Sequence, residues 1–224
     1  MLTGTPANFE NDELDEMFTD WLWALKEFSI MGIVVLAPVI FSEKQQRHAI
    51  AVYPPRLLDA AKQLADSKDF CDTWSASRSP LVVWQTLSSS GRVDAASWRN
   101  LWCSFGCQSF VRVAFEVPDQ RSFECYLFSS SNWQTRNEPS MVAWSALNIW
   151  PELKQKLSAV ISPLSPRELQ CLRLAFAGLT ARESADKIEC SERTVNFHIT
   201  NAMGKLKVDS KVAAIQRAML LGCL

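Results

Sequence analysis

Histidine, glycine and long apolar runs are scarce in this chain, and each shortage excludes a class of protein. Only two histidines occur among 224 residues, and neither His48 nor His198 lies near a cysteine pair with metal-ligand spacing. No Gly-rich phosphate loop and no Ser/His/Asp or Cys/His constellation is present. We therefore expect no catalytic residues, no metal and no cofactor, and predict that the protein is not an enzyme.

The longest apolar run, residues 30–41, is shorter than the ~20 residues that a membrane-spanning helix needs. No basic segment with a cleavage site precedes it. The seven cysteines are odd in number and scattered, which favours small buried hydrophobes in a reducing compartment over a disulfide framework. We therefore expect a cytoplasmic protein without a membrane partner.

The charge is unevenly distributed, although the net charge is only −1. From residue 162 onward, nine Lys and Arg residues stand against six Asp and Glu residues, while acidic residues are in excess before that point. Positive charge at one end of a chain favours contact with a polyanion.

The first 157 residues alternate between helical and strand patterns. Apolar side chains recur at helical spacing over residues 11–28, 56–65, 95–105 and 139–157. Between these helices, β-branched or alternating runs predict strands over residues 30–41, 48–53, 81–84, 109–117 and 122–128. Helices that flank a strand-rich middle predict an α/β/α sandwich.

Residues 165–224 contain four helix-start signals in close succession. Ser165 and Thr180 each precede a glutamate three residues later, which is the capping-box pattern, and Ser191 and Ser210 are predicted N-caps. The brief turn at residues 189–190 between the second and third helices is typical of a helix-turn-helix.

These patterns predict an α+β protein with two domains. Residues 1–157 would form the first domain, residues 158–164 a linker, and residues 165–224 an all-α four-helix domain.

The third predicted helix of that domain, residues 192–206, has one apolar and one polar face. The apolar, inward face consists of Val195, Ile199, Ala202, Met203 and Leu206. The outward face carries side chains suited to base edges and phosphates: Arg193, Asn196, Phe197, Thr200, Asn201 and Lys205. Thr180 and Thr194 lie in first turns of helices, where hydroxyl and N–H groups can meet phosphate oxygens. A solvated helical module without a DNA partner is the alternative interpretation.

The stretch from Leu164 to Val208 resembles the DNA-binding domain of the LuxR family, also called GerE-type. The residues at the family's spacing are Glu168, Leu172, Gly178, Thr180, Ala185, Ile188, Ser191, Thr194, Val195, His198, Lys205 and Leu206. The resemblance implies binding to double-stranded DNA.

The resemblance also implies roles for single residues. The positions that reach bases in the family correspond here to Asn196, Phe197 and Thr200. The positions near the DNA backbone correspond to Thr194, His198 and Lys205, although a structural role is the alternative for His198. Many members have Lys or Arg at the positions of Asn196 and Thr200, so we expect this chain to depend more on dimerisation and DNA shape.

Residues 1–157 resemble the family's autoinducer-binding domain, which senses acyl-homoserine lactones. The resemblance rests on Tyr53-Pro54, on the strand at residues 81–84 and on Gly106 before the predicted hairpin. In the lactone-contacting pattern, Trp84 matches, and Asp69 matches when a one-residue gap is allowed.

Three other positions depart from that pattern. Leu57 and Ala61 stand where the family has aromatic residues, and Phe110 stands where it has a glycine. A lactone would leave buried polar groups unpaired there, at about 1–3 kcal/mol each. We expect Phe110, together with Trp84, Trp98 and Trp102, to fill the space that a ligand would occupy. The alternative is that these tryptophans are part of an ordinary hydrophobic core.

The predicted function is a dimeric, sequence-specific DNA-binding regulator that does not depend on an acyl-homoserine lactone. Its operator would be an inverted repeat of roughly 18–20 base pairs. Residues 210–222 would dimerise the small domain, and Trp21 and Trp23 are candidates for a second interface. The alternatives are an anti-activator that forms heterodimers with a lactone-responsive relative, and a receptor for a different small molecule.

Overall fold

The computed structural model describes residues 12–38, 47–67, 82–87, 97–117 and 121–224. These residues fall into two compact units, the first drawn mainly from residues before Ser158 and the second from Ser158–Leu224. Each unit has its own core, so each is described by itself.

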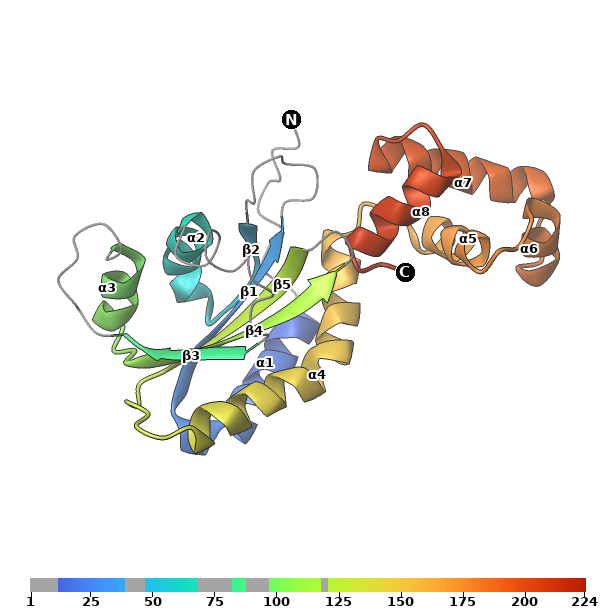
Figure 1. Ribbon diagram of the computed structural model, residues 1–224. Coiled ribbons are helices and arrows are strands. Elements are labelled where there is room, and N and C mark those ends of the chain that lie inside the picture. The colour runs from blue at the N-terminus through green and yellow to red at the C-terminus, as the bar shows by residue number, and fades with distance from the viewer. Residues whose placement is uncertain (1–11, 39–46, 68–81, 88–96, 118–120) are drawn as a thin grey trace. The chain divides into compact units, whose positions relative to one another are not determined.

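A five-stranded sheet forms the centre of the first unit. Its strands are β1 (Ile30–Pro38), β2 (Arg47–Tyr53), β3 (Val82–Thr86), β4 (Ser109–Val117) and β5 (Arg121–Ser129), and their order in the sheet is β2-β1-β5-β4-β3 (Figure 1). Strand β1 pairs antiparallel with both β2 and β5, and β3 pairs antiparallel with β4. From Gly32 to Pro38 every residue of β1 is buried, which confirms the prediction from its continuous apolar run of a strand covered on both faces.

Helices cover both faces of this sheet (Figure 1). Helices α1 (Asp12–Ala24) and α4 (Asn137–Ile161) lie on one face, and α2 (Leu58–Asp66) and α3 (Ser97–Ser104) lie on the other. Two single turns of 3₁₀ helix, Lys26–Phe28 and Pro55–Leu57, follow α1 and precede α2. The predicted α/β/α sandwich is confirmed.

The end of α4 differs from the prediction. The helix was expected to end at residue 157, but it continues to Ile161, four residues into the predicted linker. The backbone N–H of Ser162 still donates to the carbonyl of Ser158 at 3.0 Å. Pro163 disfavours helical backbone at the residue before it, so the helix ends there and not at the small residues that suggested a linker.

Aromatic side chains join the helices to each face of the sheet. On the α1 and α4 face, Phe115 of β4 stacks on Trp150 of α4 with ring centroids 3.8 Å apart. Trp21 is 4% exposed, and its indole N–H donates to the hydroxyl of Ser145 at 2.6 Å, which links α1 to α4. Trp21 therefore belongs to the core of its own unit, and its expected place in an interface was wrong; Trp23 is 70% exposed.

The second unit contains four helices and no strand in its described residues. They are α5 (Pro166–Phe176), α6 (Ala181–Lys187), α7 (Glu192–Leu206) and α8 (Lys211–Leu220), drawn from orange to red in Figure 1. Two small apolar clusters hold them together, one between α5, α7 and α8 and one between α5, α6 and α7. Of all the helices in the described ranges, none is both long and apolar enough to cross a membrane.

Candidate nucleic-acid interface

Each helix of the second unit begins at the residue that the sequence indicated. Ser165 and Thr180 form complete capping boxes: each side chain accepts from the N–H of the glutamate three residues on, whose carboxylate accepts from the N–H of the cap. The hydroxyls of Ser191 and Ser210 accept from the N–H groups of Thr194 and Ala213, both at 3.1 Å. All four predicted N-caps are confirmed.

Helix α7 buries the apolar face that its periodicity predicted. Val195, Ile199, Ala202 and Leu206 are at most 8% exposed, and Met203 is half-buried against both clusters. Since these residues recur at intervals of three and four, they occupy one stripe of the helix and fix which side of α7 faces away from the unit.

The opposite side of α7 is open. Arg193, Asn196, Phe197 and Thr200 are exposed, and the exposed fraction of Phe197 is 61%. Side chains nearer the stripe, those of Thr194, His198 and Asn201, are half-buried. The outward side chains therefore form a polar strip along the helix, with the phenyl ring of Phe197 as its one apolar member. The centroid of that ring lies 5.8 Å from the centroid of the His198 imidazole.

The turn before α7 is tight. Glu189 has a φ of 52°, in the left-handed region, and the N–H of Cys190 donates to the carbonyl of Ala185 at 3.0 Å. This closes α6, and α7 begins directly after the cap at Ser191. Helices α6 and α7 are thus held as a pair in which α7 presents its polar strip.

Three of the predicted contact residues also have partners inside the unit. The hydroxyl of Thr180 donates to Glu183 at 2.8 Å, and the hydroxyl of Thr194 lies 2.8 Å from that of Ser191. The ammonium of Lys205 donates to Glu168 at 2.9 Å, although its side chain is 43% exposed. Caps and an internal ion pair therefore already engage these three groups.

The first unit brings together most of the residues expected to line or fill a ligand pocket. Leu57, Ala61, Trp98, Trp102 and Phe110 all belong to one buried cluster between the sheet and helices α2 and α3. Trp102 stacks on Phe128 with centroids 3.5 Å apart, and Trp98 meets Phe110 edge to face at 5.8 Å. Leu57 packs over Gly32 so closely that a Cβ at residue 32 would lie 2.5 Å from its Cδ1.

Trp84 is placed differently from the expectation. In the β3–β4 ladder it pairs with Val111, and cross-strand partners point to the same side of a sheet. Phe110 is adjacent to Val111 in β4, so Trp84 faces away from the side of Phe110. Its assignment to the pocket is therefore corrected: Trp84 is half-buried on the other face. Asp69 lies outside the described residues.

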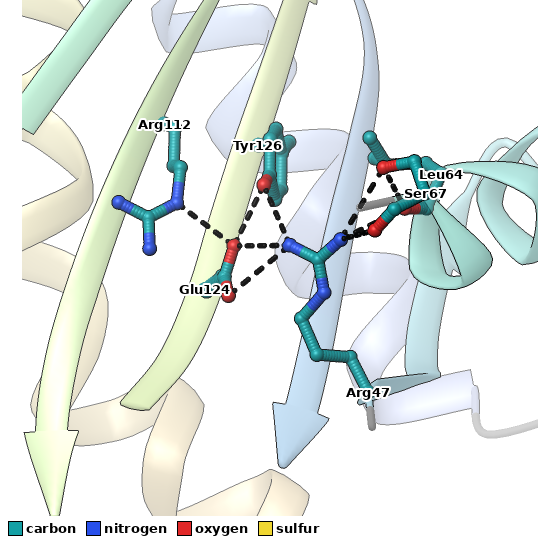
Figure 2. Close-up of polar contacts among 6 residues, drawn as sticks. All are labelled: Arg47, Leu64, Ser67, Arg112, Glu124 and Tyr126. Atoms are coloured by element: carbon teal, nitrogen blue, oxygen red, sulfur yellow. Dashed lines mark hydrogen bonds and ion pairs between the residues drawn. The ribbon is translucent and has the colours of Figure 1, made fainter. Parts of the chain in front are cut away.

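Next to the aromatic cluster lies a buried ionic network that was not predicted from the sequence (Figure 2). The carboxylate of Glu124 accepts from Arg47 at 3.0 Å, from Arg112 at 2.8 Å and from the hydroxyl of Tyr126 at 2.6 Å. Arg47 also donates to the carbonyls of Leu64 and Ser67 at the end of α2, at 3.1 and 2.8 Å. The network joins β2, β4, β5 and α2.

The charges of this network stabilise one another. Desolvation favours the neutral form of Glu124, but Arg47 and Arg112 outweigh it and lower the pKa of the carboxyl group. Burial, together with the neighbouring carboxylate, raises the pKa of Tyr126 well above its usual value. Arg112 and Glu124 each stand between two apolar residues in the middle of a predicted strand, and this was the sequence signal for the network.

Comparison with known proteins places the second unit in a family. Residues 162–218 match the family described as bacterial regulatory proteins, luxR family. The chain is 48% identical over 61 residues to the transcriptional activator AnoR of Acinetobacter nosocomialis, a match that covers 27% of this chain and 26% of AnoR. It is 27% identical over 161 residues to the transcriptional activator SolR of Ralstonia nicotianae, over 66% of each protein.

The alignment with the crystal structure of Escherichia coli SdiA covers 96% of this chain and 93% of the SdiA chain, at 17% identity and a TM-score of 0.44. The matches to AnoR and SolR each span less than two thirds of those relatives. The caps, the turn and the polar strip of α7 define a helix-turn-helix of the DNA-binding class. Residues 162–218 form such a domain of the LuxR family.

Proposed function

We propose that this protein is a transcription regulator of the quorum-sensing LuxR type, which acts in the cytoplasm and binds duplex DNA as a homodimer through α7. One observation carries the proposal. In a LuxR-type domain, α7 buries its apolar stripe and leaves Asn196, Phe197 and Thr200 exposed. A helix with this exposed strip fits a major groove about 12 Å wide, where amide and hydroxyl groups meet base edges.

The form of the operator follows from two-fold symmetry. Two copies of α7 in successive major grooves lie about 34 Å apart, so an inverted repeat of roughly 18–20 base pairs is expected. Selection of bound duplexes from a random library by the full-length protein tests this directly. Recovery of an inverted repeat supports the proposal, and a pool without any shared sequence contradicts it.

Substitutions in the strip test the assigned roles. Asn196→Ala and Thr200→Ala should relax the base preference at single positions and cost about five- to tenfold in operator affinity. Gln170→Ala removes an exposed amide on α5 and serves as the matched control. Equal losses on the operator and on random duplex would show that these side chains do not read bases.

Exposed apolar side chains support dimerisation of the first unit. Met141, Trp144 and Leu147 of α4 are 58, 66 and 37% exposed, and Trp23 of α1 lies beside Lys26. A groove of about 760 Å³ runs between these two helices. Trp and Met are enriched in interfaces, so we assign this surface to the dimer, with α8 as a second contact. Trp144→Ser should shift sedimentation toward the monomer, whereas Asp66→Asn, an exposed change on α2 at the other face of the sheet, should not.

Independence from a lactone is supported by the filled aromatic cluster. Leu57, Ala61 and Phe110 are at most 2% exposed and pack among the rings of Trp98 and Trp102. The domain should therefore express in soluble form without ligand. A thermal-shift titration with acyl-homoserine lactones of several chain lengths should leave the melting temperature unchanged, and stabilisation by several degrees would overturn this part of the proposal.

One observation favours a receptor for another small molecule as a second candidate. The indole N–H of Trp102 is buried, and among the described residues it has no hydrogen-bond acceptor. A carbonyl oxygen of a ligand would satisfy it. Thermal-shift screening of neutral carbonyl compounds separates this candidate from the first. Binding of the operator by purified protein in a gel shift likewise separates a regulator from an anti-activator, which would not bind DNA by itself.

A further inference from the structure

The last turn of α7 is held by polar contacts from two other helices. The ammonium of Lys205 donates to Oε2 of Glu168, on α5, at 2.9 Å. From α8, Nη1 of Arg217 donates to the carbonyl of Leu206 and, at 3.0 Å, to that of Lys207. Positive charge at a helix C-terminus is favourable because the last carbonyls have no partner within the helix.

Glu168 is the residue on which this arrangement depends. It is 4% exposed, and the oxygen that accepts from Lys205 also accepts from the N–H of Ser165 at 2.7 Å. One carboxylate therefore connects the N-cap of α5 with the last turn of α7. Burial favours its neutral form, but the hydrogen bonds from Lys205 and Ser165 outweigh burial and lower the pKa of Glu168.

The place of this contact along α7 gives it leverage on the polar strip. The first turns of α7 are held by the cap at Ser191 and by the cluster around Val195. Thr200 lies nine residues after Ser191, so at 1.5 Å per residue their separation along the helix axis is about 13 Å. A tilt of about 5° about the N-terminal end would move Thr200 by roughly 1 Å, which is more than a hydrogen bond to a base tolerates.

We propose that Glu168 is a positioning residue for DNA recognition: through Lys205 it sets the angle at which α7 enters the groove. In this role Lys205 serves the internal ion pair, and it does not act as the phosphate contact that family resemblance implies. The inference rests on the proposed function, because it concerns the affinity of α7 for its operator.

Substitution of Glu168 separates positioning from simple electrostatics. Glu168→Gln keeps an oxygen that accepts from Ser165 but removes one negative charge, so electrostatics alone predicts tighter binding to any DNA. Positioning predicts the opposite for the operator. We expect Glu168→Gln to weaken operator binding about tenfold and to leave binding to random duplex unchanged or slightly tighter.

Lys205 supplies the second half of the test. Lys205→Met should weaken operator binding to a similar extent, and the double variant should bind about as well as either single variant. Lys205→Arg keeps the positive charge and should retain the wild-type affinity. A lost phosphate contact would instead lower the slope of log K against log salt by about 0.9. Arg167→Met, which removes an exposed positive charge from α5, is the control, and far-UV circular dichroism verifies that each variant is helical.

The outcomes are distinguishable. Operator binding by Glu168→Gln at or above wild-type strength overturns the inference, and so does a lowered salt slope for Lys205→Met. A wild-type protein that selects no sequence refutes the proposed function itself. Specific binding by the wild type, together with coupled and equal losses in the two variants, establishes Glu168 as the positioning residue.

Discussion

The two units of this protein are stabilised in different ways. The first contains all nine tryptophans and both tyrosines, and its sheet carries aromatic stacks and a buried ionic network. The second has no Trp or Tyr; side-chain caps start its four helices, and its two cores are small. The first unit therefore depends on contacts between distant residues, and the second on signals within a few residues of each helix end.

This difference shows which contacts can be predicted from sequence patterns alone. A cap and the N–H that it satisfies are three residues apart, so both lie in one short stretch of sequence. Arg47 and Glu124 are 77 residues apart and meet only because β1 lies between β2 and β5 in the sheet. The same difference also makes the units experimentally separable, since tryptophan fluorescence reports the first unit alone.

The largest expected effect is the loss of the carboxylate at the centre of the network. Glu124→Gln removes the charge that faces both Arg47 and Arg112, and breaking a buried ion pair in this way typically costs about 3–5 kcal/mol. The free energy of unfolding, measured by urea titration with tryptophan fluorescence, should fall by that amount. Glu16→Gln, the same change on the exposed side of α1, is the matched control and should have no measurable effect.

A pH titration sharpens this prediction. Because the pKa of Glu124 is lowered in the folded state, its contribution to stability is present above the unfolded-state pKa of about 4.3 and is lost as the pH falls through the folded-state pKa. The fluorescence-detected free energy of unfolding should therefore fall as the pH decreases below about 5. Glu124→Gln should show a smaller slope over this range, and an equal slope in both proteins would contradict the assignment.

Smaller effects are expected in the second unit. Ser191→Ala removes the hydroxyl that caps α7, and Thr180→Ala removes the one that caps α6, at about 0.5–2 kcal/mol each. Circular dichroism should detect the loss of helix stability, whereas tryptophan fluorescence should not change. A shift of the fluorescence transition would show that the units do not unfold independently, which would break the comparison.

The smallest effect is expected where an aromatic side chain of the first unit is exposed. Trp23 is 70% exposed and contacts Lys26, with the ammonium 4.4 Å from the ring centroid, so Trp23→Ser should alter stability by about 0.5 kcal/mol or less. Two residues earlier, Trp21 is buried and bonded to Ser145, so Trp21→Ser should destabilise the same helix by several times more. The urea midpoints of the two variants test whether burial of the tryptophan, and not the residue type, determines the loss of stability.

Much of the helix-turn-helix was predictable from sequence. Caps at Ser165, Thr180, Ser191 and Ser210 and the apolar stripe of α7 fixed the helix ends and the face that points outward, because both signals are local and periodic. The internal partner of Lys205 was not predictable, since Glu168 lies 37 residues earlier and neither its capping pattern nor its family spacing indicates a contact with Lys205.

In the first unit the elements were predicted better than their contacts. Strand and helix periodicity gave the sandwich, yet Trp84 was assigned to the wrong face and Trp21 to an interface. Facing direction in a strand changes with a shift of one residue, and strand register is set by pairing partners that are far away in sequence.

The helices, the strands and the outward polar strip of α7 follow from the sequence alone, because capping and periodicity act over one to two helical turns. The match of residues 162–218 to the LuxR family is likewise a property of the sequence. Only the tertiary structure decided that Glu124 would join two arginines and that Glu168 would hold the end of α7. A charge becomes a partner only when the fold buries it beside its opposite, and that proximity is a property of packing and not of spacing along the chain.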